Sequence, residues 1–130
     1  MVHAGMCENW GYEKLHGRIE KRAIEEMKHA EMLINRILFL NGFPTVSKLN
    51  KITIGAKVED QFKNDLASEI GAVGSYNAGV KACVAEGDNG SRELLESILK
   101  DEEAHLDWLE AQLDQIEQIG IQTYLVEQID

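Results

Sequence analysis

The sequence contains little proline, little cysteine and no excess of basic residues. One proline in 130 residues, with Glu, Lys, Leu, Ile and Ala abundant in long stretches, favours helices over strands. The formal net charge of −10 argues against a nucleic-acid partner, because phosphate binding requires a basic surface. No apolar run approaches the roughly 20 residues of a membrane span, and the first residues show no signal-peptide pattern.

The two cysteines, Cys7 and Cys83, are too far apart in the sequence to form a typical metal-binding pair. Two unpaired thiols fit a reducing cytoplasm. The length suits one compact domain with one core. We therefore expect a cytoplasmic protein that forms a single domain over residues 1–130 and binds neither membrane nor nucleic acid.

Helical periodicity divides the chain into segments that are separated by glycine-containing turns. The helices are expected at about residues 2–10, 12–40, 57–85, 91–118 and 122–128. The turn at 87–90 is short, and Asp88 or Ser91 is expected to cap the helix that follows. The connection at about 41–57 is long enough to cross the length of a bundle. One long crossover with short hairpins is typical of a ferritin-like four-helix bundle, here followed by a short C-terminal helix.

Two Glu-x-x-His motifs stand out, Glu26 with His29 and Glu102 with His105. In a helix this spacing places both side chains on neighbouring turns of one face. At 100° per residue both glutamates interrupt an apolar stripe, and Glu69 interrupts the stripe of the helix between them. The apolar neighbours are Ile19, Ala23, Ala30, Leu33 and Ile37, then Val58, Phe62, Leu66, Val73, Tyr76, Val80 and Cys83, and finally Leu95, Ile98, Leu99, Leu106, Leu109 and Leu113.

Three carboxylates on apolar faces need compensation, because an isolated buried charge costs roughly several kcal/mol. No Lys or Arg lies at the centre of these stripes, although Arg22 is near the edge of one. Mixed Glu and His ligands suit iron, manganese or zinc. The alternative is that each glutamate extends from the edge of its stripe into water. Three such glutamates, two with a histidine at equal spacing, favour a dinuclear metal site.

The segments around these residues resemble bacterioferritin. The matching segments are Glu25–Ile34, Arg36–Leu40, Asp65–Glu69 and Asp101–Glu110. The resemblance extends from His3 to Ile129. It implies an iron-storage protein that oxidises Fe²⁺ with O₂ or peroxide, a ferroxidase, built as two-fold dimers within a shell of 24 copies.

The resemblance also implies a role for each candidate ligand. Glu26 and Glu102 would bridge two irons, His29 and His105 would each bind one iron, and Glu69 would be a terminal ligand. The implied cofactor is therefore a di-iron centre.

Met27 matches the family's haem ligand, which implies a b-type haem held between two subunits. Unaided, a methionine at this position is more typical of core packing. Met27 lies on a second apolar stripe, about 100° from Glu26, together with Ile24, Ile34 and Leu38. A helix with two apolar stripes needs a partner for the second one, which favours a dimer interface on this helix.

The sequence departs from the family pattern at its beginning. The family's first helix supplies a sixth metal ligand, a Glu upstream of the His-Ala motif, whereas here His3-Ala4 stands at the start, so the first helix is expected to be truncated. Glu8 and Glu13 lie several turns downstream and cannot easily replace that ligand. The stretch Glu20–Ala23 also departs from a His-Glu-Ser-like run, and a solvated charge run is its simpler interpretation.

Three functions remain open from the sequence. The first is a ferroxidase and iron-storage subunit. The second is a non-catalytic storage or haem-binding subunit that lacks full activity because one ligand is absent. The third is a rubrerythrin-like peroxidase, which usually carries a Cys-rich module that has no counterpart here.

Overall fold

The computed structural model describes residues 1–130 and contains five helices and no strand. The helices are α1 (Val2–Asn9), α2 (Glu13–Phe39), α3 (Val58–Ala85), α4 (Asn89–Ile119) and α5 (Ile121–Val126). The predicted all-α class is confirmed, and the predicted helix ends agree to within a few residues. None of these helices combines the length and the apolarity that crossing a membrane requires.

The ends of the long helices follow from local chemistry. Asp88 is the N-cap of α4, and its side chain accepts a hydrogen bond from the Ser91 backbone N–H at 3.0 Å. Of the two predicted caps, Asp88 is therefore the one used. Gly120 ends α4 with a φ of 81°, a left-handed conformation that glycine adopts without steric cost.

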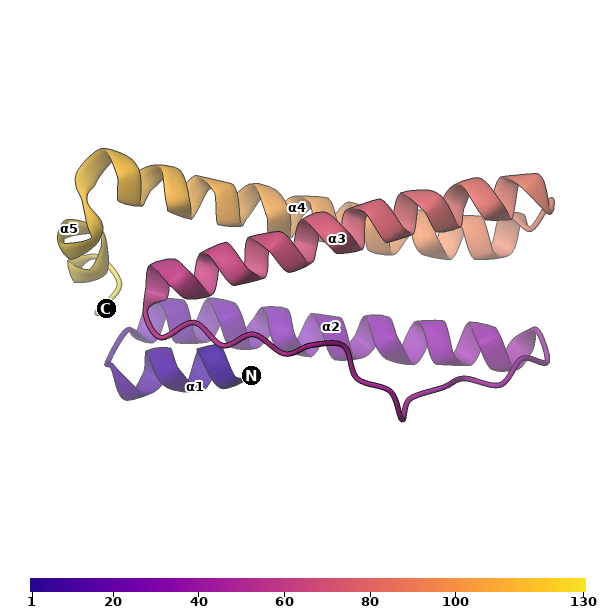
Figure 1. Ribbon diagram of the computed structural model, residues 1–130, viewed down its shortest axis with the longest axis horizontal. Helices are drawn as coiled ribbons and strands as arrows, with labels where there is room; N and C mark the ends of the chain where they lie inside the picture. The colour runs from indigo at the N-terminus through magenta and orange to yellow at the C-terminus, as the bar shows by residue number, and fades with distance from the viewer. The chain divides into compact units, whose positions relative to one another are not determined.

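The chain forms two compact units, one of residues 1–55 with 122–130 and one of residues 56–121. In the first unit α1 lies beside α2, as Figure 1 shows. The C-terminal segment is tied to the same unit, because the Lys14 backbone N–H donates to the Gln128 carbonyl at 3.2 Å. Tyr124 and Cys7 are both buried. The prediction of one domain over residues 1–130 stays a prediction.

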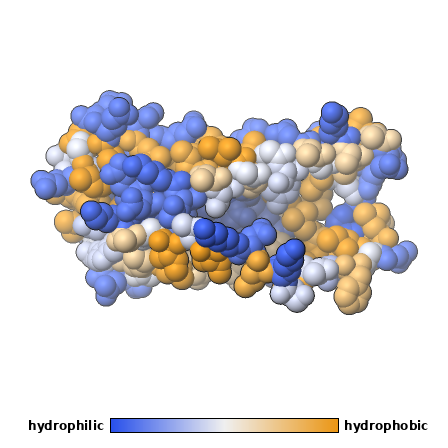
Figure 2. All heavy atoms as spheres, in the orientation of Figure 1, coloured by the Kyte–Doolittle hydropathy of each residue, from blue (hydrophilic) through white to orange (hydrophobic).

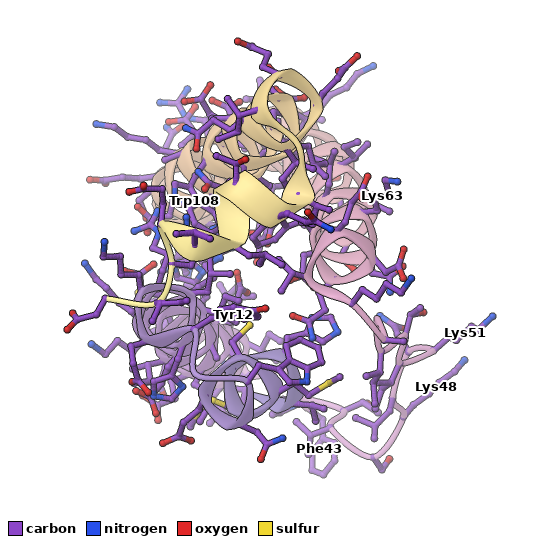
Figure 3. The ribbon with its side chains drawn as sticks, turned by 90° about the vertical axis from the view of Figure 1, so that its left-hand side faces the viewer. Tyr12, Phe43, Lys48, Lys51, Lys63 and Trp108 are labelled. Carbon is purple, nitrogen blue, oxygen red and sulfur yellow. The ribbon has the colours of Figure 1, made fainter.

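The long connection after α2 runs back beside that helix (Figure 1). Its end is fixed by the Gly55 backbone N–H, which donates to His3 Nε2 at 3.1 Å. Most of its apolar side chains are exposed, and Phe43 is 93% exposed. The others are Val46, Leu49, Ile52 and Ile54. Figure 2 shows apolar side chains along the lower edge of the view, and in Figure 3 Phe43, Lys48 and Lys51 project outward from this connection.

In the second unit α3 and α4 form an antiparallel hairpin (Figure 1). Phe62, Ile98 and Leu109 are almost fully buried, as expected for the apolar stripes of two packed helices. The helices approach closely at Gly79, where a Cβ atom would lie 3.0 Å from Leu95 Cδ1. This hairpin holds one set of the candidate metal ligands.

Candidate metal centre

The first pair of candidate ligands lies on one face of α2. His29 Nδ1 is 3.9 Å from Glu26 Oε1, as the spacing of three residues in a helix predicts. His29 is buried, whereas the Glu26 side chain is 44% exposed. The imidazole and the nearby Glu26 Oε1 are both shielded from water, while the rest of the Glu26 side chain is partly exposed.

Arg22 provides Glu26 with a counter-ion that the sequence pattern did not reveal. The Arg22 side chain is only 7% exposed, and its Nη2 forms an ion pair with Glu26 Oε1. Its Nη1 lies 3.9 Å from Glu25 Oε2. The interpretation of Glu20–Ala23 as a solvated charge run is therefore wrong for Arg22, because this guanidinium packs along its own helix toward Glu26 and Glu25.

The second set of candidate ligands lies on the α3–α4 hairpin. His105 Nε2 of α4 is 4.0 Å from Glu69 Oε1 of α3. Glu69, His105 and Glu102 are all buried, and Glu102 is only 1% exposed. The inward orientation that the apolar stripes predict for these three residues agrees with their burial. Three buried ionisable groups on one hairpin make a strongly polar site, because burying such groups is unfavourable unless they are compensated.

An aromatic residue supports His105. The rings of His105 and Trp108 are stacked, with centroids 5.9 Å apart and an interplanar angle of 10°. Trp108 in turn meets the Phe62 ring edge-on, with centroids 5.7 Å apart. Its position three residues after His105, on the same face of α4, is the sequence signal for this contact.

The geometry within each unit fits a divalent metal. Two donors that each lie about 2.1 Å from one ion are at most about 4.2 Å apart. The Glu26–His29 distance of 3.9 Å and the Glu69–His105 distance of 4.0 Å both satisfy this limit. Carboxylate and imidazole together form a donor set that suits iron, manganese and zinc.

Met27 lies on the exposed stripe of α2 and is 59% exposed. Ile24 and Leu38 on the same stripe are also exposed. Core packing within the chain therefore does not account for Met27. The prediction that this stripe needs a partner is consistent with its exposure, and the haem ligand stays a prediction.

Comparison with known proteins identifies the family. The ferritin-like domain model matches residues 1–119. A bacterioferritin of Brucella melitensis is 39% identical over 95% of this chain and 76% of its own length. A bacterial ferritin of Synechocystis is 41% identical over 98% of this chain and 83% of its own length. A bacterioferritin of Mycobacterium leprae is 37% identical over 95% of this chain and 77% of its own length.

These matches cover nearly the whole chain and confirm the resemblance that the sequence segments indicated. Together with the five helices, they confirm the predicted ferritin-like fold with a short C-terminal helix. The chain belongs to the bacterioferritin family of ferritin-like proteins.

Proposed function

We propose that this chain stores iron and oxidises Fe²⁺ at a di-iron site. The proposed ligands are Glu26, His29, Glu69, Glu102 and His105. The observation that carries the proposal is the buried Glu69–His105 pair at 4.0 Å, accompanied by the buried Glu102. Membership of the bacterioferritin family and the Glu26–His29 pair on α2 support it.

The proposed roles follow from the chemistry of each side chain. Glu26 and Glu102 would bridge two irons, since a carboxylate has two oxygens that can each bind one metal. His29 and His105 would each bind one iron as neutral imidazoles, and Glu69 would complete one of the two coordination shells.

Iron itself supplies the redox chemistry, with O₂ or peroxide accepting the electrons that Fe²⁺ loses. Oxidation raises the charge on each iron. Anionic carboxylates stabilise the ferric product more than the ferrous substrate, because attraction grows with charge. Burial of Glu69 and Glu102 strengthens this effect by lowering the local dielectric constant. The protein would thus favour oxidation through its own ligands.

The exposed apolar surfaces support assembly into larger particles. The α2 stripe with Ile24, Met27 and Leu38 is proposed as a two-fold interface between copies of the chain. Two Met27 thioethers, one from each copy, would hold a b-type haem there and supply sulfur ligands to its iron. Twelve such dimers would form the shell of 24 subunits in the cytoplasm that stores the ferric product.

A non-catalytic storage or haem-binding subunit is the second candidate. The ion pair between Arg22 and Glu26 favours it, because a carboxylate held by a guanidinium is less available to iron. The two candidates differ in the rate of Fe²⁺ oxidation and agree in iron storage.

Stopped-flow absorption measurements of Fe²⁺ oxidation test the proposal. We expect Glu69→Gln to slow the fast phase at least about tenfold, as loss of a metal-site group typically does. Glu93→Gln, which removes the same charge from an exposed position on α4, is the matched control and should leave the rate unchanged. Equal rates in all three proteins would reject the ferroxidase site, and iron storage without a fast phase would support the second candidate.

A further inference from the structure

We propose that Arg22 is an internal counter-ion that occupies Glu26 while the metal site is empty and moves to Glu25 when a divalent cation binds. This inference rests on the proposed function, because it concerns the availability of one of the proposed ligands. It assigns to Arg22 the role of setting the metal affinity of the site, with Glu25 as the receiving carboxylate.

Arg22 contacts the Glu26 oxygen that a shared metal would need. Its Nη2 is paired with Glu26 Oε1, the same oxygen that lies 3.9 Å from His29 Nδ1. A metal shared by Glu26 and His29 would need this oxygen as a donor. Arg22 and the metal therefore compete for one atom.

The permanent charge of the guanidinium means that Arg22 has to move when a metal binds. The guanidinium of arginine stays protonated in proteins, so Arg22 cannot release Glu26 by losing its proton. A guanidinium next to a divalent cation would be repelled by it. Metal binding therefore requires the Arg22 side chain to move away from Glu26.

Glu25 offers Arg22 a second carboxylate with which to form an ion pair. Its Oε2 is already 3.9 Å from Arg22 Nη1, beyond a hydrogen bond and within reach of a small side-chain rotation. The Glu25 side chain is 43% exposed and is not among the proposed ligands. In the loaded site a full Arg22–Glu25 ion pair would keep the guanidinium compensated although it is buried.

The consequence is a lower affinity of the site for divalent cations. When no metal is bound, the charge of Glu26 is balanced by Arg22. Without Arg22, Glu26 would lose the cation that its Oε1 contacts on α2. With Arg22, a metal has to displace an ion pair before it gains the carboxylate. Arg22 thus lowers the metal affinity of the site and stabilises the site when no metal is bound.

Titration of the full chain with Co²⁺, followed by its visible absorption and by calorimetry, tests this inference without relying on oxidation activity. We expect Arg22→Gln to bind Co²⁺ about five- to tenfold more tightly, the effect of removing one competing charge-assisted contact. Lys21→Gln removes the same charge from the exposed neighbouring position and should change the affinity less than twofold, roughly the limit expected of an exposed charge. Arg22→Lys keeps the charge without the planar fork and should fall between the wild type and Arg22→Gln.

Glu25→Gln separates the proposed movement from a general charge effect. It should weaken Co²⁺ binding in the wild-type background, because Arg22 then lacks its second carboxylate. In the Arg22→Gln background the same change should have a much smaller effect. Similar losses in both backgrounds, or equal affinities of the wild type and Arg22→Gln, would overturn the role of Arg22 and leave the proposed iron site standing.

Circular dichroism checks that each variant is folded before titration. If no folded variant binds Co²⁺ or Fe²⁺, the proposed function and the inference both fail. If the wild type binds and Arg22→Gln binds more weakly, Arg22 organises the site, and only the inference fails.

Discussion

His105 Nε2 on α4 lies 4.0 Å from Glu69 Oε1 on α3, although 36 positions separate the two residues in the chain. Both side chains are buried. The two groups are too far apart for a hydrogen bond and close enough to share one metal ion. This pair of side chains, held within one helical hairpin, is the main support for the proposed metal site.

Replacing Trp108 with Leu should weaken metal binding without unfolding the chain. Trp108 stacks on His105 and so limits the orientations of a proposed ligand ring. We expect a loss of about tenfold in Co²⁺ affinity, a typical effect of a group that orients a ligand. Trp10→Leu, on the C-cap of α1, is the control and should leave the affinity unchanged. An unchanged affinity in Trp108→Leu would show that the ring contact has no positioning role.

Replacing Met27 with Leu should abolish haem binding while preserving the fold. Met27 is exposed on α2, so a leucine of similar size causes no loss of core packing. After reconstitution with haem, the wild type should show the absorption of a haem with two thioether ligands, and the variant should not. Met32→Leu on the same helix is the matched control. Identical haem spectra for wild type and Met27→Leu would reject Met27 as the ligand.

His16 should make a small contribution to stability that decreases as pH rises. The hydrogen bond to the Ala4 carbonyl, at 3.1 Å from Nδ1, raises the pKa of His16 above its usual 6.5, and Glu8, Glu20 and Glu13 add to this shift while desolvation opposes it. The protonated form is therefore preferred in the folded state. Its stabilising effect is fully present below the unfolded pKa and is lost as pH rises through the higher folded pKa.

Thermal unfolding of the wild type and His16→Gln measures this effect. The difference in melting temperature between the two proteins should be larger near pH 6, below the usual pKa of 6.5, than near pH 8.5, because the stabilising effect is lost as pH rises. A difference that is constant or grows with pH would contradict the assignment. Comparison with the variant removes the contribution of the other titrating groups.

Replacing Asp88 with Ala should destabilise the second unit by about 1 kcal/mol, the usual cost of losing an N-cap side chain. Asp88 accepts from the Ser91 backbone N–H at 3.0 Å and begins α4. Urea unfolding followed by circular dichroism measures the change, and Asp88→Asn should retain most of the stability because it keeps an acceptor oxygen. A destabilisation equal in both variants would argue against the capping role.

The positions of the helices follow from local pattern. A period of 3.6 residues, with glycine and Asp88 at the boundaries, determines where each helix begins and ends, because these preferences act over a few neighbouring residues. The Glu26–His29 pair is equally local, since helical geometry alone brings side chains three residues apart together. The burial of Glu69 and Glu102 could likewise be predicted from their apolar neighbours.

Tertiary packing decided what the pattern left open. The pairing of Glu69 with His105 depends on the register of α3 against α4, which side chains along the whole hairpin determine. The stacking of Trp108 on His105 and the burial of Arg22 depend on rotamers, and rotamers are selected by the space that packing leaves. Arg22 shows most clearly what the local pattern could not predict. Its charge predicts a position in water, but the side chain is buried, and the ion pair with Glu26 compensates the cost of burying that charge.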